Sequence, residues 1–269
     1  MKGFSYMASL ITANGISMKY SLDGPEGAPT VLFSNSLMSN YTMWDGQVPA
    51  LGETYRVLRY DTRGHGGSET PPGPYNFDQL AADAIGLLNA LGIERAHFIG
   101  LSMGGMIGQV LGAKYPERLL SLAICDSSSN MNAKEIWDGR IAMAERDGIA
   151  AMVEPTIERW FTPAFVEKGS KDLDKIRDMI RTTSLEGYIA NAQAIRDMNL
   201  TGILRQITTP TVVIVGEDDP ATPLEQSRVI HDNIQGASLV ILKDAAHLSN
   251  IEQAEKFNAA LLGFLAKNS

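Results

Sequence analysis

Several features that would narrow the function are scarce or missing in this chain of 269 residues. The single cysteine, Cys125, excludes an intrachain disulfide and argues against a zinc cluster. No apolar run approaches the length of a transmembrane helix. The opening residues, MKGFSYMASL, lack the continuous apolar segment and the small-residue cleavage site of a signal peptide. We therefore expect a cytoplasmic protein.

Basic side chains are also in the minority. The chain has 23 Lys and Arg against 31 Asp and Glu, which gives a formal net charge of −8. Such a charge argues against nucleic acids and anionic membranes as partners, because both would be repelled. It also means that an acidic substrate would need an arginine or lysine close to it. The length favours one large α/β domain, with or without an insertion.

The most informative stretch is HFIGLSMGGMIGQ, residues 97–109. Its centre fits G-x-S-x-G, the nucleophile elbow in which a serine sits on a tight turn between a strand and a helix. A short apolar run precedes Ser102, and helical spacing begins at Met103. Gly100 and Gly104 are expected to leave room for a strained serine backbone, since a Cβ at either position would crowd the turn. The pattern predicts Ser102 as a nucleophile.

Short apolar runs alternate with helical patterns on both sides of this elbow. The expected strands are residues 10–13, 16–21, 30–34, 55–60, 96–99, 119–125, 211–215 and 238–242. The expected helices between and after them are residues 43–51, 77–91, 103–115, 223–233 and 249–267. This alternation predicts a mostly parallel eight-stranded sheet with helices on both faces.

The alternation is interrupted between residues 130 and 205, where no strand is recognisable. Helical patterns at residues 134–146, 150–160, 171–182 and 188–198 fill this stretch. So much helix between two strands is an insertion and not a loop. The prediction is a helical cap, residues 130–205, inserted after the sixth strand of a core formed by residues 1–129 and 206–269. Trp137 and Trp160 are first interpreted as the hydrophobic interior of this cap.

A serine nucleophile needs a base, and the base needs an acid to orient it. On this pattern the acid and then the histidine follow the serine in the chain. Only two histidines follow Ser102. His231 falls on an expected surface helix, whereas His247 lies in the loop after the last strand, where such sheets bind ligands. His247 is therefore the predicted base.

The loop after residues 211–215 holds three adjacent carboxylates, Glu217, Asp218 and Asp219. Asp219 ends the turn and precedes a proline, so it is the predicted acid, and the other two are interpreted as solvated charges. Asp126, at the end of the strand before the cap, is the rival because that strand also ends at the crevice.

The oxyanion formed during acyl transfer needs two backbone N–H donors. Met103, at the start of the elbow helix, and Leu37, in the loop after residues 30–34, are the candidates. His65, among glycines before the nucleophile, is interpreted as a structural loop residue, and His97 as a core residue. No Lys-Ser/Thr follows the glycines at phosphate-loop spacing, and we expect neither a metal nor another cofactor.

Together these segments resemble the α/β-hydrolase fold, and within it the 3-oxoadipate enol-lactonases and related small esterases. The resemblance is carried by Asn35-Ser-Leu, Met43-Trp-Asp, YDTRGHGGS at residues 60–68, GLSMGGMIG at residues 100–108 and WDGRI at residues 137–141. It implies the same triad of Ser102, Asp219 and His247, with Leu37 and Met103 as oxyanion donors. It also suggests Trp137 as a pocket residue. Met38 stands where these relatives usually have glycine, a change that would reshape the acyl side of the pocket.

The sequence thus predicts a serine hydrolase that cleaves a small carboxylic ester or lactone through an acyl-enzyme. The alternatives on the same scaffold are a perhydrolase, a C–C bond hydrolase or a non-catalytic ligand receptor. A halide-displacing enzyme is disfavoured, because it would need a carboxylate at position 102. A dicarboxylate lactone would require an arginine facing the pocket, and Arg140, beside Trp137, is the candidate.

Overall fold

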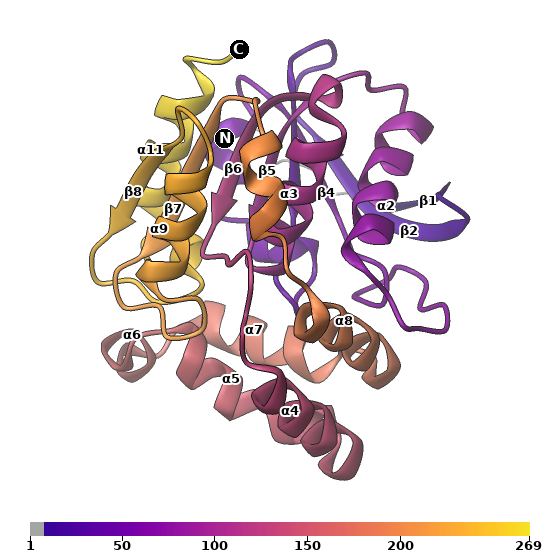
Figure 1. Cartoon of the computed structure of the whole chain (residues 1–269), viewed down its shortest axis with the longest axis vertical. Helices are drawn as coiled ribbons and strands as arrows, with labels where there is room; N and C mark the ends of the chain where they lie inside the picture. The colour runs from indigo at the N-terminus through magenta and orange to yellow at the C-terminus, as the bar shows by residue number, and fades with distance from the viewer. Residues whose placement is uncertain (1–7) are drawn as a thin grey trace.

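A computed structural model describes residues 8–269 and contains an eight-stranded sheet between two layers of helices (Figure 1). The strand order is β1-β2-β4-β3-β5-β6-β7-β8. The strands are β1 (Ala8–Ala13), β2 (Ile16–Asp23), β3 (Thr30–Ser34), β4 (Arg56–Tyr60), β5 (Ala96–Leu101), β6 (Leu119–Cys125), β7 (Thr211–Gly216) and β8 (Ser238–Leu242). Strand β2 runs antiparallel to both of its neighbours, and all other pairs are parallel.

The sequence explains which strands are central. All residues of β3, β5 and β7 are buried, as their continuous apolar runs predict for parallel strands covered on both faces. The edge strand β1 is mostly exposed. Its hairpin with β2 turns at Asn14-Gly15, where both residues have positive φ, as the Asn-Gly signal predicts.

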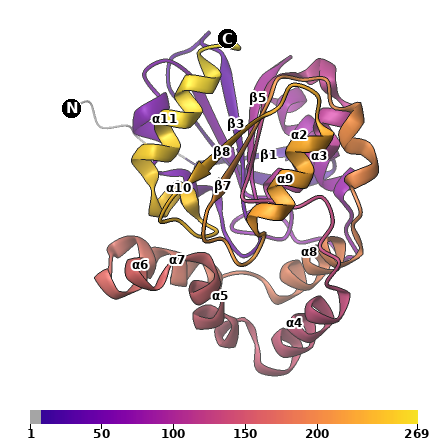
Figure 2. The same ribbon diagram turned by 60° about the vertical axis from the view of Figure 1, so that its left-hand side comes forward.

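Helices cover the two faces unequally. Those of the core are α1 (Val48–Leu51), α2 (Phe77–Ala90), α3 (Met103–Lys114), α9 (Leu224–Asn233), α10 (Ser249–Glu252) and α11 (Ala254–Leu265), with short 3₁₀ turns η1 (Tyr41–Trp44) and η2 (Pro116–Arg118). Figure 2 shows α2, α3 and α9 on one face of the sheet and α11 on the other. The expected eight-stranded α/β sheet with helices on both faces is confirmed.

The remaining helices lie between β6 and β7 and cover one end of the sheet (Figures 1 and 2). They are α4 (Lys134–Asp147), η3 (Ile149–Met152), α5 (Val153–Trp160), α6 (Pro163–Lys168), α7 (Lys171–Arg181) and α8 (Leu185–Asp197). The turn that follows them, η4 (Thr201–Gln206), packs against α3 and α9 on the face of the sheet. We call residues 130–205 the cap, with the boundaries that the sequence predicts. Side chains of Thr162, Ser170 and Ser184 cap α6, α7 and α8, which explains why the cap is a series of short helices.

Three helix predictions need correction. The expected helix at residues 43–51 is instead η1 and α1, because Asn40 caps an earlier turn and Pro49 lies at the start of α1. The closing helix is divided into α10 and α11 at Gln253, whose φ of −123° is not helical. Helix α6 was not predicted, since its six residues are too few to show a period.

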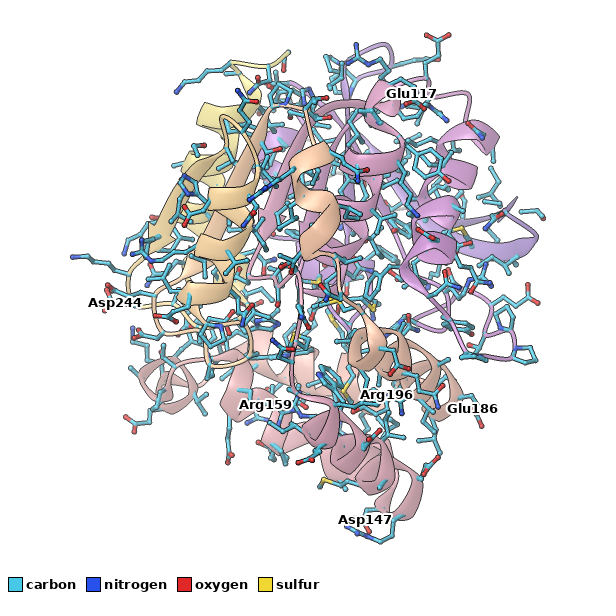
Figure 3. All side chains as sticks on the ribbon, in the orientation of Figure 1. Glu117, Asp147, Arg159, Glu186, Arg196 and Asp244 are labelled. Atoms are coloured by element: carbon cyan, nitrogen blue, oxygen red, sulfur yellow. The ribbon has the colours of Figure 1, made fainter. Side chains whose placement is uncertain are left out.

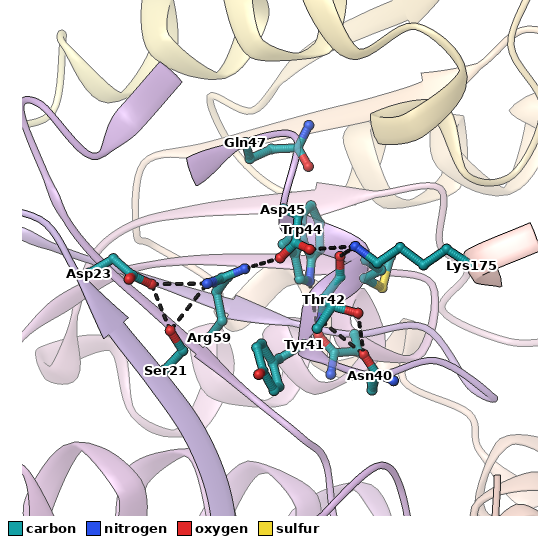
Figure 4. Close-up of polar contacts among 12 residues, drawn as sticks. Ser21, Asp23, Asn40, Tyr41, Thr42, Trp44, Asp45, Gln47, Arg59 and Lys175 are labelled. Carbon is teal, nitrogen blue, oxygen red and sulfur yellow. Dashed lines mark hydrogen bonds and ion pairs between the residues drawn. The ribbon is translucent and has the colours of Figure 1, made fainter. Parts of the chain in front are cut away.

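A partly buried ion cluster joins the cap to the core (Figure 4). Arg59 of β4 contacts Asp23 at 2.9 Å and Asp45 at 2.5 Å, so its buried charge is compensated. Lys175 of α7 contacts the same Asp45 and donates to the carbonyl oxygen of Thr42 at 3.0 Å. Through Lys175, the cluster therefore connects α7 of the cap to the segment that follows β3.

Candidate active site

Ser102 lies on the turn between β5 and α3 with φ 56° and ψ −114°, a strained backbone for an L-residue. The neighbouring glycines make this turn possible. A Cβ on Gly100 would lie 2.1 Å from the carbonyl oxygen of Gly104, and one on Gly104 would lie 2.2 Å from that of Ser34. The Ser102 amide donates to the carbonyl oxygen of Cys125 at 2.8 Å, which fixes the turn against β6. The local geometry is that of a nucleophile elbow.

The loops after β7 and β8 bring two predicted side chains together. His247 Nδ1 lies 2.8 Å from Asp219 Oδ2, and both side chains are buried. Asp219 also accepts from the amides of Ala221 and Thr222 and from Thr222 Oγ1, at 2.8, 3.1 and 2.7 Å. These donors fix the orientation of the carboxylate. Because Nδ1 faces Asp219, Nε2 is the ring nitrogen left to receive a proton.

The other carboxylates and histidines considered as candidates lie elsewhere. Glu217 and Asp218 are exposed. Asp126 contacts the amide of Gly216 and the Ser249 hydroxyl, and no bond joins it to an imidazole among residues 8–269. His231 is half-buried on α9 and bonds to its neighbour Asp232.

The predicted oxyanion donors are the backbone amides of Leu37 and Met103. Neither amide donates a hydrogen bond to an acceptor among residues 8–269. The two segments that carry them are joined by the Gly104 amide, which donates to the carbonyl oxygen of Asn35 at 3.0 Å. The Asn35 side chain is held in turn by the Tyr60 carbonyl oxygen and by the indole N–H of Trp44, at 2.7 and 3.0 Å. Two free N–H groups on a fixed frame are what oxyanion binding requires.

His65 secures the other end of this loop and does not line the cavity described below. Its Nε2 accepts from the Met38 amide at 3.0 Å. Met38 has φ 61°, which explains why a glycine would suit that position. Burial lowers the pKa of His65 to about 4, partly opposed by its contact with the Arg63 carbonyl oxygen, so the ring is neutral at pH 7 and can accept this bond.

This neutral histidine predicts a loss of stability in acid. In the unfolded chain His65 has an ordinary pKa of about 6.5, so the unfolded state binds the extra proton between about pH 6.5 and pH 4. The free energy of unfolding should fall as the pH drops through this window, by up to about 1.4 kcal/mol per pH unit from this group. Urea unfolding of His65→Gln at pH 4.5, 5.5 and 6.5 should show a shallower dependence than wild type. Equal slopes in the two proteins would contradict the assignment.

A cavity of about 50 Å³ lies between the cap and the core. Ser102 and His247 both line it, together with Ser36, Leu37, Met38, Met106, Met131, Trp137, Arg140, Thr156, Arg159, Trp160, Tyr188, Ile195, Ala221 and Thr222. Small-molecule pockets usually measure about 300–1,000 Å³, so we expect lining side chains to move when a substrate binds.

Several lining residues come from the cap. Trp137 and Arg140, both predicted from the sequence, lie on α4. Trp160 is buried in the cap, as predicted, and also lines the cavity, where its ring lies 6.3 Å from that of His247. Thr156 and Arg159 were missed, although they share one face of α5 with Trp160 at helical spacing, which was the available signal.

Two arginines of the cavity have no carboxylate partner. Arg140 stacks over the Trp137 ring at 4.9 Å, and Arg159 (labelled in Figure 3) donates to Thr156 Oγ1 at 2.9 Å. Among residues 8–269 neither forms an ion pair. Burial, with a smaller effect of the Arg140 charge, lowers the pKa of Arg159 to about 10, and burial also lowers that of Arg140. Uncompensated cations next to Ser102 favour an anionic ligand.

The loop of His247 is bonded directly to the cap. The Leu248 amide donates to the carbonyl oxygen of Trp160 at 3.0 Å. The Glu252 carboxylate accepts from the amide of Ala246 at 2.9 Å and from the amide of Thr162 at 3.1 Å, and it also accepts from the Thr162 hydroxyl. The cap segment between α5 and α6 therefore bonds to Leu248 and Glu252, which follow His247, and Glu252 in turn bonds to Ala246, which precedes it.

Within residues 8–269, no helix has the length and apolarity needed to cross a bilayer, and no three His, Cys, Asp or Glu side chains group closely enough to hold a metal ion. The elbow, the loops around it and the eight-stranded sheet agree with a comparison of family models, in which one described as alpha/beta hydrolase fold matches residues 29–165. A second, described as TAP-like protein, matches residues 190–269. The chain belongs to the α/β-hydrolase fold family.

Particular relatives narrow this class. The chain is 35% identical to 3-oxoadipate enol-lactonase 2 of Acinetobacter baylyi over 93% of its own length and 94% of that protein. A crystal structure of the enol-lactonase from Burkholderia xenovorans LB400 superposes with a TM-score of 0.94 at 40% identity, covering 96% of this chain and all of the other. A putative carbamate hydrolase RutD of Stutzerimonas stutzeri is 31% identical over 93% of this chain and 97% of that protein.

Proposed function

We propose that this α/β-hydrolase, an enzyme of the ester- and lactone-cleaving class, works through Ser102, His247 and Asp219. Ser102 Oγ attacks the carbonyl carbon while His247 Nε2 takes the hydroxyl proton. Asp219 holds His247 in the required tautomer through the bond at Nδ1 and stabilises the imidazolium that forms. The amides of Leu37 and Met103 bind the negative oxygen of the tetrahedral intermediate. The observation that carries this proposal is the buried Asp219–His247 pair beside an elbow serine in one cavity.

Acylation ends when His247 gives its proton to the leaving oxygen, which in a lactone stays attached to the acyl group. In the second half of the reaction a water molecule loses a proton to His247 and attacks the acyl-enzyme, and His247 then gives this proton to Ser102 Oγ as the oxygen leaves. The cap residues that line the cavity with Ser102 and His247 support a cap that shields the acyl-enzyme from bulk water.

The proposed substrate is a small lactone that carries a carboxylate, such as 3-oxoadipate enol-lactone. Arg140 and Arg159 support this class, because they are the cations that line the cavity with Ser102. A carboxylate placed between them would be attracted by both guanidinium groups and would compensate one of the two charges. The relatives named enol-lactonases support the same substrate.

This proposal is tested by substrate selectivity. Wild type should have a much higher kcat/KM for 3-oxoadipate enol-lactone than for a neutral short-chain aryl ester. Arg159→Gln should lower kcat/KM for the lactone by about 100-fold, since a desolvated charge pair is lost, and change that for the neutral ester by less than about threefold. Arg140→Gln should act in the same direction, and Arg159→Lys should recover part of the loss.

The matched control is Arg146→Gln, which removes the same charge from the exposed end of α4, where Arg146 pairs with Asp147. It should leave both kcat/KM values unchanged. Equal losses on both substrates in Arg159→Gln would count against an anion site. A preference of wild type for the neutral ester would leave an esterase, and turnover of a carbamate in place of the lactone would favour the activity named for the RutD relatives.

A further inference from the structure

Asp126 is a fully buried acid that the proposed reaction does not use, and it lies where β6, β7 and the loop after β8 meet. It directly follows β6 with φ 42°, a backbone that Asp and Asn adopt more readily than other L-residues except glycine. Its amide donates to the carbonyl oxygen of Ile214 in β7 at 2.8 Å. Its backbone is therefore fixed by the sheet.

The Asp126 carboxyl group joins two loops. Its Oδ1 accepts from the amide of Gly216, the last residue of β7, at 2.7 Å. Its Oδ2 lies 2.5 Å from the hydroxyl of Ser249, two residues after His247. The loops are also in direct contact there, since a Cβ on Gly216 would lie 2.3 Å from the carbonyl oxygen of Ala246. Asp126 thus holds the start of the Asp219 loop and the end of the His247 loop.

We propose that Asp126 is a positioning residue for the Asp219–His247 pair, whose carboxyl group sets the spacing of the two loops through these two hydrogen bonds. The inference rests on the proposed triad. It gives this acid a role separate from that of Asp219. Asp126 acts on the reaction only through the groups it holds, because it does not line the cavity.

The surroundings of the carboxyl group favour its neutral form. The titratable groups that act on it are acidic: Asp219 after β7, Glu252 on α10 and the Cys125 thiol of β6. Burial first, and then the charge of Asp219, raise the pKa of Asp126 well above its usual range, against the opposing effect of its two hydrogen bonds. No cation pairs with Asp126 in the part of the chain described here, residues 8–269.

Asp126 Oδ1 accepts from the Gly216 amide, and the Ser249 hydroxyl donates to Oδ2. A hydroxyl can also accept a hydrogen bond. Asparagine can make the same two contacts, because its amide oxygen accepts and its NH₂ donates.

The test uses Asp126→Asn, which keeps both bonds, and Asp126→Gly, which loses both but tolerates φ 42°. Two readouts are compared: kcat and KM for a neutral aryl ester from pH 5 to 9, and the rate constant for labelling of Ser102 by a fluorophosphonate. We expect Asp126→Gly to lower kcat and the labelling rate by about 10- to 100-fold with KM within about twofold, as a small misplacement of reacting groups does. Asp126→Asn should stay within about threefold of wild type. Ser249→Ala, which loses one bond, should lie between them.

The acid limb of the plot of kcat/KM against pH is a further readout, because a purely structural role of Asp126 would not shift it. It should be unchanged in Asp126→Asn, since no charge is removed. The matched control is Asp83→Asn, another buried carboxyl, which pairs with Arg63 at 2.7 Å. It should lower the melting temperature without changing the labelling rate of the folded protein.

Three results would overturn the inference: wild-type labelling in Asp126→Gly, an equal loss in Asp126→Asn and Asp126→Gly, or a shifted acid limb in Asp126→Asn. The last two would mean that the acid works as an anion. If wild-type Ser102 itself resists the fluorophosphonate, the proposed function is overturned together with this inference. If wild-type Ser102 is labelled but any of the three results is found, the inference about Asp126 is overturned and the proposed function is not.

Discussion

Ser102→Ala should lower kcat by about 10⁶-fold on any ester or lactone that the wild type cleaves, because it removes the proposed nucleophile. Fluorophosphonate labelling should disappear with it. The fold should persist, since the hydroxyl of Ser102 forms no hydrogen bond with another side chain among residues 8–269 and the backbone turn is held by Cys125 and the two glycines. Circular dichroism and urea unfolding would check this, and residual turnover above about 1% of wild type would contradict the assignment.

A second substitution at the same position separates chemistry from strain. Ser102→Gly also lacks the hydroxyl and should be equally inactive. Because glycine adopts φ 56° without a steric penalty, this variant should be more stable than Ser102→Ala by about 1 kcal/mol. If both variants are inactive and Ser102→Gly is the more stable, the difference in stability is due to backbone strain at the elbow.

Asp219→Asn should lower kcat by about 10⁴-fold with little change in KM. The amide would present an N–H to His247 Nδ1, which then accepts in place of donating, and the proton would move to Nε2 where it blocks the base. Steady-state kinetics at the optimum pH provides the measurement.

The control for this variant is next to it in the chain. Asp218→Asn removes the same charge from an exposed side chain of the same loop and should keep kcat within about twofold. If Asp219→Asn retained a tenth of the wild-type kcat, Asp219 would not be the orienting acid. A loss of kcat in Asp218→Asn but not in Asp219→Asn would identify Asp218 as the orienting acid.

The fold could be predicted because its signals are local. The apolar runs of β6 and β8 gave their bounds without error, and Asn14-Gly15 identified the hairpin. The elbow was recognisable because its two glycines and its serine are adjacent in the chain. Chain order and loop position then pointed to Asp219 and His247, which the structure brings within 2.8 Å of each other.

What could not be predicted depends on contacts between distant segments. Helical spacing places Arg159 on one face of α5 with Trp160, but only the packing of α5 brings that face to the cavity that Ser102 lines. The neutral state of His65 follows from its burial, which no sequence pattern gives. The role of Asp126 requires β6, β7 and the loop after β8 to meet. The break at Gln253 depends on its local backbone, not on a residue type that ends helices.

The bonds between the His247 loop and the cap limit how far the cap can be treated as an exchangeable module. A cap taken from another member of the family would bring its own residues against Glu252 and Leu248. Unless the counterparts of Trp160 and Thr162 offered the same carbonyl oxygen and donors, the loop of His247 would lose support in the chimaera. Recombination that aims at a new substrate should therefore cross over after residue 162 or carry residues 246–252 along with the cap, so that pocket and base are inherited together.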